Sequence, residues 1–249
     1  MDVVYINRPG DENEELRYSL RSLKHIPHDE VWIVGYRPTW VQANSIPVEG
    51  MRDKQTSALN NLIAALEHPE VSDPFIVFND DFFVMQPLEE IPTYHLGDLD
   101  KVIAEHRPGT AYRNAMQKTR DRLIENQAEN IDGALYSYET HCPMVIEKLG
   151  MQLALSIGQG IHGMHNRTMY GNLMEVGGTE TSDFKIYRTE KESAYKQWPY
   201  ISTSDRTFHY HHAGRYIREM FSKPGPYEKQ LASTRRGRAI RYHSVVINP

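Results

Sequence analysis

The stretch Phe75-Ile76-Val77-Phe78-Asn79-Asp80-Asp81-Phe82-Phe83-Val84 decides the fold of this chain. Its first four residues form an unbroken apolar run, which is typical of a strand in a parallel sheet covered on both faces. Two adjacent carboxylates, Asp80 and Asp81, follow that run between very apolar flanks. Two like charges near the interior are costly unless a cation lies beside them. The segment therefore predicts a buried strand that ends at a charged site.

The residues before this segment alternate strand and helix patterns. Residues 2–6 and 31–34 are short apolar runs that we expect to be strands, and each is followed by a helical pattern. Asp11 is placed to cap the first helix, with Glu14 in capping-box spacing, and Asp53 is placed to cap the second. Leucine and isoleucine residues recur at helical spacing in both segments: Leu16, Leu20 and Leu23, then Leu59, Leu62, Ile63 and Leu66. This β-α-β-α-β order predicts an α/β fold with a central, mostly parallel sheet flanked by helices.

The second half of the chain gives weaker patterns. Residues 110–130 are polar and favour helix, so we expect a surface helix or a lid. Pro143 is placed to open a helix that runs to Leu149, residues 184–187 are expected to form a strand, and residues 215–221 a helix. Residues 150–180 show no clear pattern. We find no internal repeat.

Composition and charge limit the class of protein. The chain has 249 residues, a 39% hydrophobic content and a formal net charge of −5. It contains no apolar run of about 18 residues, as a membrane span would need, and it does not begin like a signal peptide. One cysteine, Cys142, excludes an intramolecular disulfide framework, and we interpret it as structural. These features predict a cytoplasmic globular protein of one domain.

The charge is unevenly distributed. Residues 206–249 hold 9 of the 28 basic residues but only 2 of the 33 acidic ones, so an acidic body precedes a basic C-terminal extension. The arginines Arg235, Arg236, Arg238 and Arg241 are suited to contact phosphates of nucleic acid or of an anionic membrane surface. A solvated tail is the alternative.

The Asp80-Asp81 pair has the pattern of a metal site. A hard divalent cation, Mn²⁺ or Mg²⁺, prefers oxygen ligands, and many nucleotide-sugar transferases hold such a metal on the donor diphosphate with an acidic pair at a strand end. Ligands of α/β sheets bind at the carboxyl ends of the strands, where this pair is expected. The alternative is a solvated turn between two strands.

Basic and amide side chains stand where a diphosphate would meet them. Arg17 and Arg21 are one turn apart on the first expected helix, and Arg52 and Lys54 precede and open the second, whose N-terminus is suited to phosphate. Two strand-end residues, Asn7 and Asn79, complete the candidate donor contacts. For the basic residues, ordinary surface pairing is the alternative.

Histidines and one aspartate are the remaining candidates. His141, before Cys142 and Pro143, is a catalytic candidate that would contact phosphate or take a proton from an acceptor. His212, in the run His209-Tyr210-His211-His212, is a candidate metal ligand from the far end of the chain. Asp205 is a candidate catalytic base, although Ser, Thr and Asp before a helix more often serve as its cap. His162 and His165 form a second group of histidines.

Four stretches of this sequence resemble the Stealth proteins, bacterial capsule sugar-phosphate transferases related to the lysosomal-enzyme N-acetylglucosamine-phosphotransferase. They are Asp2-Val3-Val4-Tyr5; Asn13 to Leu23 with residues 31–34 and Pro38-Thr39-Trp40; the Asn79-Asp80-Asp81 segment; and His141-Cys142-Pro143. The resemblance covers about the first 150 residues. It implies metal and donor diphosphate binding at Asp80 and Asp81. The first loop departs from the family, because Ile6-Asn7-Arg8-Pro9-Gly10 stands where the family has Trp-Val-Asp-Gly.

Three stretches of the second half are more similar to compact bacterial and phage glycosyltransferase-like proteins: Tyr170-Gly171-Asn172-Leu173, residues 202–205 and Lys223-Pro224. This resemblance implies a nucleotide-sugar-binding fold of GT-A type. On this reading residues 1–90 form the nucleotide-sugar-binding half, residues 91–205 the acceptor or lid half, and residues 206–249 the extension. We expect a metal-dependent glycosyltransferase with a nucleotide-sugar donor. Sugar-1-phosphate transfer and a non-catalytic carbohydrate- or nucleotide-binding module are the alternatives. A metal-dependent phosphohydrolase ranks lower, because it needs more converging carboxylates.

The sequence does not identify the acceptor. A polysaccharide, a protein, a lipid-linked sugar and a modified DNA base are the four classes left open.

Overall fold

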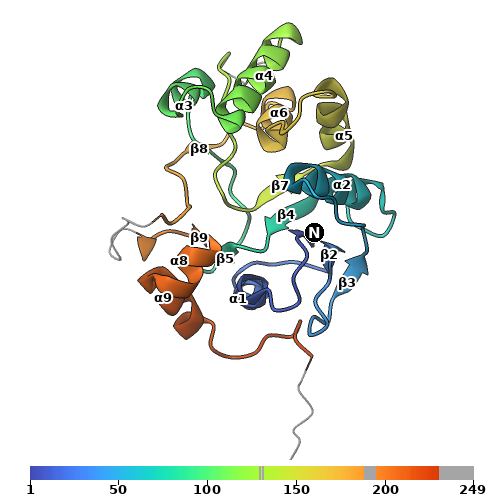
Figure 1. The fold of residues 1–249 in the computed structure, drawn as a ribbon, viewed down its shortest axis with the longest axis vertical. Helices are drawn as coiled ribbons and strands as arrows, with labels where there is room; N and C mark the ends of the chain where they lie inside the picture. The colour runs from blue at the N-terminus through green and yellow to red at the C-terminus, as the bar shows by residue number, and fades with distance from the viewer. Residues whose placement is uncertain (129, 131, 188–194, 230–249) are drawn as a thin grey trace, which may run out of the picture.

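The chain is a mixed α/β structure with a five-stranded central sheet flanked by helices (Figure 1). The computed structural model describes residues 1–128, 130, 132–187 and 195–229. The sheet contains β1 (Asp2–Asn7), β2 (Val31–Gly35), β3 (Asn44–Ile46), β4 (Phe75–Asn79) and β7 (Met144–Ile146), in the order β3-β2-β1-β4-β7. The first four strands are parallel and β7 is antiparallel to β4. The expected class, with a mostly parallel sheet, is confirmed.

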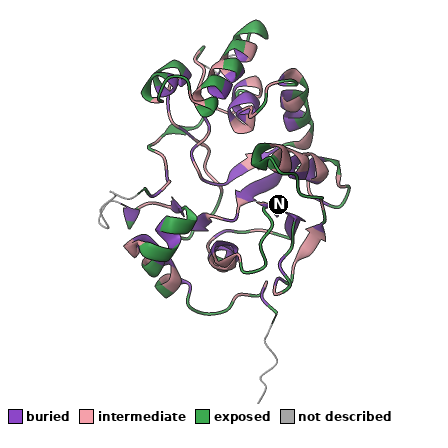
Figure 2. Ribbon diagram, in the orientation of Figure 1, coloured by how far each residue is buried: buried purple, intermediate pink, exposed green. Residues whose placement is uncertain are grey.

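Helices cover both faces of this sheet, because alternate side chains of a strand point to opposite faces. From β1, Val3 and Tyr5 belong to a fully buried cluster with Leu16 and Leu20 of α1 (Glu14–Ser22). Val4, between them, belongs to the cluster on the other face, with α2 (Lys54–Glu67). Figure 2 shows the strands of the sheet as the buried centre of the molecule. The continuous apolar runs of the sequence follow from this double coverage.

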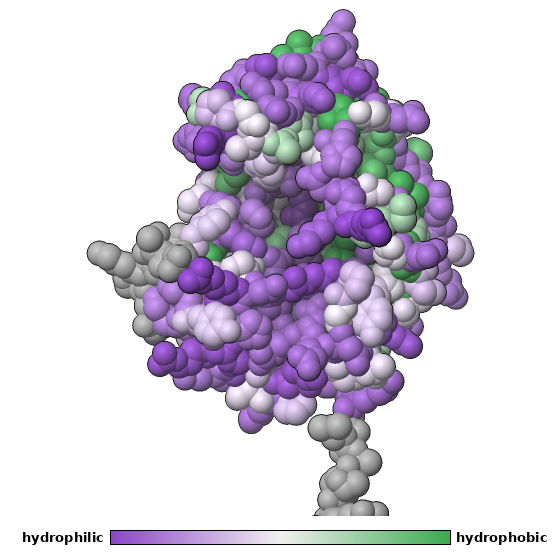
Figure 3. All heavy atoms as spheres, viewed as in Figure 1, coloured by the Kyte–Doolittle hydropathy of each residue, from purple (hydrophilic) through white to green (hydrophobic). Residues whose placement is uncertain are grey.

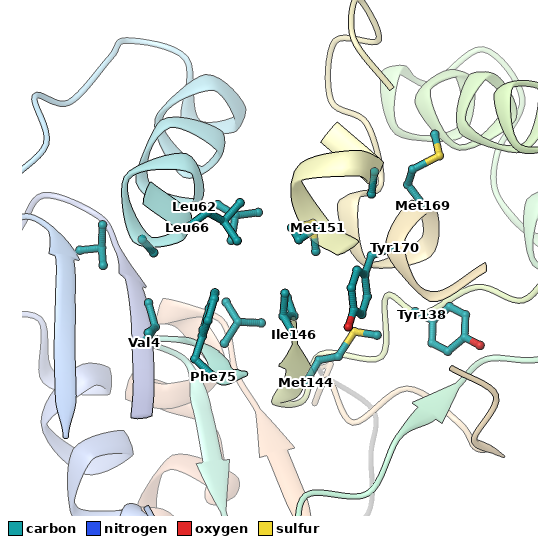
Figure 4. Packing of buried hydrophobic residues seen from close by; sticks show 14 of the residues in the cluster. Val4, Leu62, Leu66, Phe75, Tyr138, Met144, Ile146, Met151, Met169 and Tyr170 are labelled. Atoms are coloured by element: carbon teal, nitrogen blue, oxygen red, sulfur yellow. The ribbon is translucent and has the colours of Figure 1, made fainter. Parts of the chain in front are cut away.

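The cluster on the α2 face extends into the second half of the chain. Figure 4 shows Leu62 and Leu66 of α2 above Phe75 of β4, with Met151 and Tyr170 continuing the layer from α5 (Lys148–Ile157) and α6 (Asn166–Leu173). The helices α3 (Leu99–Glu105) and α4 (Ala111–Glu125) lie beside α6 at the same end of the molecule (Figure 1). The expected helix within residues 110–130 is therefore present, and its outer face is exposed.

The two expected helix caps have different outcomes. Asp53 caps α2 by accepting a hydrogen bond from the Thr56 amide at 2.8 Å. The expected cap at Asp11 is wrong: Asn13 caps α1. The Asp11 carboxylate instead accepts a hydrogen bond from the Thr39 amide at 2.9 Å, which fixes the first loop against the loop after β2.

Two expectations for the second half are also wrong. Residues 144–146 form strand β7, because their backbone pairs with residues 75–77 at the edge of the sheet, and the helix begins only at Lys148. Residues 184–187 contain a single bridge, between Lys185 and Ser202, in place of a strand.

A third cluster joins the middle of the chain to its C-terminal part. Strand β5 (Phe82–Val84) pairs antiparallel with β9 (Tyr200–Ser202), and Phe83 packs with Phe208 of α8 (Asp205–Tyr210) and Ile217 of α9 (His212–Met220). The expected helix at 215–221 is thus present as α9. The expected boundary after residue 205 falls inside α8, so residues 206–221 pack as part of the body. The arginines of the expected basic extension, from Arg235 to Arg241, lie outside the described residues.

Three further short elements lie within the described residues: η1 (Leu23–His25) and the two-stranded pair β6 (Tyr94–His95) and β8 (Thr179–Glu180). Among the described residues, no helix is long and apolar enough to cross a membrane.

Candidate functional site

The candidate site lies where β1 and β4 end side by side in the sheet. From β1 the chain proceeds outward to β2 and β3, and it then returns through α2 to β4 on the other side of β1. Such a switch point leaves a crevice at the carboxyl ends of the two strands. Asn7 and Arg8 follow from β1, and Asp80 and Asp81 follow from β4, so the topology brings these residues together. Figure 3 shows the face hollowed near its centre, between α4 and α6 on one side and α8 on the other.

Asp80 is held by the loop after β1 and by the start of α1. Its Oδ2 atom accepts hydrogen bonds from Arg8 Nε at 3.0 Å and Asn13 Nδ2 at 2.8 Å. The same Asn13 amide donates to Asn7 Oδ1 at 3.0 Å. Burial and the neighbouring Asp81 raise the pKa of Asp80 above its ordinary value. A short polar chain, Asn7–Asn13–Asp80, therefore connects the ends of β1 and β4.

Arg8 joins three carboxylates. Besides Asp80, its guanidinium donates to Glu15 Oε2 at 3.1 Å and to both carboxylate oxygens of Asp205. Glu15 is buried in α1, and burial raises its pKa to about 8. The hydrogen bonds from Arg8 lower the pKa of Asp205 to about 2, so Asp205 is a weak base. The cap of α8 is Ser204, which leaves the Asp205 side chain free for Arg8.

Asp81 has a different set of partners. Its Oδ2 atom accepts hydrogen bonds from Lys185 Nζ at 2.6 Å and Ser202 Oγ at 3.0 Å. Asp80 and Asp81 thus bind two different cations, Arg8 from the loop after β1 and Lys185 from the second half of the chain. With Glu15 and Asp205, four carboxylates surround two cations, and the cluster has an excess of two formal negative charges.

The donor atoms of this cluster fit a divalent cation in part. The described residues contain no group of three or more His, Cys, Asp or Glu side chains placed to hold a metal. However, Asp80 and Asp81 each use only Oδ2, and neither Oδ1 atom has a hydrogen bond within the described ranges. One or two carboxylates plus substrate phosphates are the usual ligands of Mg²⁺ at phosphate-transfer sites. His212 is not brought to this pair, because its Nδ1 atom bonds the Tyr195 hydroxyl in the third cluster.

His141 lies in the loop that leads into β7, with a backbone φ of 44°. Its Nδ1 atom lies 2.9 Å from both carboxylate oxygens of Asp183, and a third of its side chain is exposed. A carboxylate on Nδ1 fixes the orientation of the ring and leaves Nε2 as the proton acceptor. Asp183 is two residues before Lys185, the partner of Asp81, so one short segment touches both groups. The adjacent Cys142 is buried, and burial raises the pKa of its thiol to about 11.

A cavity of about 580 Å³ lies over the carboxyl ends of β1, β2 and β3. Asn7, Gly35, Tyr36, Arg37 and Asn61 are among the residues that line it. Gly35 has a φ of 99°, and a Cβ atom there would lie 2.5 Å from the side chain of Asn61. Only glycine therefore lets α2 approach the strand ends so closely. Arg37 is the one cation in the lining, and its other contact is with the Ala43 carbonyl at 2.8 Å.

The remaining donor-binding candidates either bond other partners, are exposed, or lie in the strand itself. Arg17 and Arg21 bind Glu228, and the Arg17 guanidinium stacks on Trp40 at 4.2 Å, so both arginines fix the C-terminal segment to α1. Arg52 and Lys54 are exposed at the start of α2 and near the 580 Å³ cavity, which Gly50 and Ser57 help to line. Asn79 is the last residue of β4, is partly buried and pairs with Ile6 of β1.

The histidine groups separate in space. His209 lies 3.6 Å from Glu14 and lines, with Asp205, a cavity of about 460 Å³ beside Arg8. His162 lies 3.2 Å from Asp53. His165 is buried, and burial lowers the pKa of its imidazole.

Sequence reasoning missed Arg8, Glu15, Lys185 and Asp183. Arg8 stands in the loop whose sequence departs from the Stealth pattern, and that departure was the available signal. Glu15 occupies an inward-facing position of α1, one residue before Leu16, where a carboxylate is unexpected. Lys185 and Asp183 lie about 100 residues from Asp81, and no local pattern connects them.

No protein-family model matches this chain, and no curated protein matches it.

Proposed function

We propose that this chain is a transferase with a fold of GT-A type that uses a nucleotide-activated sugar as donor. One observation carries the proposal. The 580 Å³ cavity over the ends of β1–β3 is connected to the acid pair by the hydrogen bonds from Asn7 through Asn13 to Asp80, at the switch point of the sheet. A cavity with polar lining residues therefore adjoins the charged cluster at the strand ends, where a metal would hold a diphosphate.

The nucleoside would occupy that cavity, whose volume lies within the ordinary range for ligands of this size. Asn7, Tyr36 and Asn61 offer polar groups, and Arg37 offers a positive charge. Arg52 and Lys54, with the N-terminus of α2, would attract the phosphates from the rim.

A divalent metal, Mn²⁺ or Mg²⁺, remains part of the proposal. The Oδ1 atoms of Asp80 and Asp81, which accept no hydrogen bond in the described part of the chain, would hold it, and its positive charge would offset the excess negative charge of the cluster. Bound there, a metal stabilises the negative charge that develops on the departing phosphate.

His141 would activate the acceptor. An acceptor hydroxyl gives its proton to Nε2 of His141 while Asp183 holds Nδ1. The acceptor oxygen then bonds to C1 of the sugar, the bond between C1 and the phosphate oxygen breaks, and the nucleoside diphosphate departs with the bonding electrons. His141 is preferred to Asp205 as the base, because Arg8 keeps Asp205 ionised down to about pH 2.

Two alternatives share this site. In sugar-1-phosphate transfer, which the Stealth resemblance favours, the acceptor oxygen attacks phosphorus and a nucleoside monophosphate departs. In a non-catalytic binding module, the nucleotide binds without turnover.

The test is one assay on the protein and two variants, Asp81→Asn and the control Asp100→Asn. Asp100 is an exposed carboxylate that pairs with Arg120 on the surface. Each protein is incubated with a panel of nucleotide sugars, Mn²⁺ or Mg²⁺, and candidate acceptors, and the released nucleotide is identified. UDP or GDP identifies glycosyl transfer, and UMP or CMP identifies sugar-phosphate transfer. We expect Asp81→Asn to lose at least 100-fold in rate and Asp100→Asn to keep it. Nucleotide binding without turnover in any of the three proteins would establish the binding module. If the unmodified protein neither binds nor turns over any donor, the proposal is refuted.

A further inference from the structure

A second cavity, of about 660 Å³, lies between α2, α5 and the loop that joins α5 to α6. Its walls are largely apolar and include Leu59 and Ile63 of α2, Leu155 of α5, and Ile161 and Met164 of the loop. The first turn of α2 closes the cavity near the loop, where His162 lies 3.2 Å from Asp53. The candidate donor site does not use this cavity.

The chemistry of the lining excludes an anionic occupant. None of the residues that line the cavity, all of them in the described ranges, is Lys or Arg, and two are Glu67 and Glu139. His165 lines it as a buried imidazole whose Nδ1 atom has no hydrogen-bond partner in the described part of the chain, and burial lowers the pKa of the ring. A phosphate or a nucleic-acid backbone would meet negative charge here and no cation.

The position of the cavity relates it to the acceptor side. Glu139, in its lining, is two residues before His141 on the same segment. Apolar surface also continues outside: Leu149 and Leu153, one turn apart on α5, are 77% and 47% exposed, and Figure 3 shows apolar residues gathered over this flank. An apolar chain that left the cavity along α5 would stay in contact with apolar side chains.

We propose that this cavity binds the uncharged alkyl chain of an amphiphilic acceptor, whose hydroxyl-bearing head group reaches His141. The proposal rests on the proposed transferase function, and it selects a lipid-linked acceptor over a polysaccharide, a protein or a DNA base. The volume suits a chain of several methylene groups, each of which is stabilised when it leaves water for an apolar wall. A glycoside with a long alkyl chain should therefore bind far more tightly than its methyl counterpart.

The test measures binding by titration calorimetry, with n-octyl β-glucoside below its micelle concentration and methyl β-glucoside as probes. We expect the octyl glycoside to bind at least tenfold more tightly. Ile63→Trp fills the cavity and should weaken octyl binding at least tenfold, whereas Ile124→Trp, the same change at a 57% exposed position of α4, should leave it unchanged. Ser156→Trp places the ring at an exposed residue of the lining and keeps the test valid if Ile63→Trp fails to fold.

Equal affinities for the two glycosides, or octyl binding that neither tryptophan in the lining reduces, would overturn the proposal. Nucleotide release from the donor is measured on the same protein samples. If the unmodified protein shows no donor turnover, the transferase function is refuted. If it turns over the donor but does not prefer the octyl glycoside to the methyl glycoside, only the lipid-linked acceptor is refuted.

Discussion

Arg8 is the residue whose removal should have the clearest consequence, because one guanidinium neutralises carboxylates from three parts of the chain. Two of these carboxylates are nearly inaccessible: the side chain of Glu15 is 4% exposed and that of Asp80 is 12% exposed. In Arg8→Ala both lose their cationic partner and stay in place. The variant should therefore be less stable, and its loss of stability should depend on pH.

The magnitude follows from burial. Removal of one partner from a buried ion pair costs about 3–5 kcal/mol, and an exposed pair contributes about 0–1 kcal/mol. The Arg8 side chain is 46% exposed, so we take the middle of these ranges, about 2 kcal/mol at pH 8. For a chain of this length that corresponds to a decrease in Tm of about 4–8 °C. At pH 5, below the raised pKa of about 8, Glu15 binds a proton and needs no cation, and the decrease should shrink to about 2 °C.

The assay is thermal unfolding of the wild type, Arg8→Ala and Arg120→Ala at pH 5 and pH 8. Arg120 also bonds two carboxylates, Asp100 and Asp121, but both are more than half exposed, so its loss should cost under about 1 kcal/mol at either pH. Two results would refute this account of the site, because they would show that Arg8 does not stabilise buried carboxylates. Either Arg8→Ala is no less stable than Arg120→Ala at pH 8, or its decrease in Tm is the same at pH 5 and pH 8.

Two further predictions concern Glu15 and Gly171. Because burial raises the pKa of Glu15 in the folded state, its contribution to stability is complete below about pH 4.5 and is lost as the pH rises through about 8. As the pH rises from 5 to 9, the free energy of unfolding of Glu15→Gln should therefore increase relative to that of the wild type by about 1–3 kcal/mol, measured by urea unfolding. A difference between the two proteins that does not change with pH would contradict the pKa shift. At Gly171, an added Cβ would lie 2.4 Å from the ring of the buried Tyr138, whose hydroxyl bonds Asn130 and Gly177. Gly171→Ala should lower the free energy of unfolding by about 1–3 kcal/mol, and an unchanged urea midpoint would show that the ring can move.

The fold was predictable where local pattern and burial agree. The apolar runs of β1, β2 and β4 and the stripes of α1 and α2 specify their elements directly, because both faces of the sheet are covered. Residues 144–146 could not be assigned in this way. Their strand depends on pairing with β4, about 70 residues away, while Pro143 before them favours a helix start on local grounds. The same limit applies to residues 184–187, where only Lys185 makes a bridge.

The site was predictable only in part. The sequence indicates Asp80 and Asp81 because a charge after an apolar strand is a local signal, and their metal binding stays a prediction. Arg17 and Arg52 are candidate donor contacts because a positive charge suits a phosphate. The sequence alone does not show which cation lies at the strand ends. Arg17 binds Glu228 near the end of the described chain instead, and Arg8 takes the position beside Asp80. Such long-range pairings are set by topology.

The different partners of Asp80 and Asp81 explain how the two parts of the molecule are held at the site. The pair forms the turn between β4, in the central sheet, and β5, which pairs with β9. Asp80 bonds Arg8 from the loop after β1, and Asp81 bonds Lys185 and Ser202, the latter at the end of β9. Each carboxylate therefore anchors the turn to a different sheet, and the position of one depends on the other. A ligand that binds both free Oδ1 atoms would join the cavity over β1–β3 to the segment that holds His141, as a reaction between a donor and an acceptor requires.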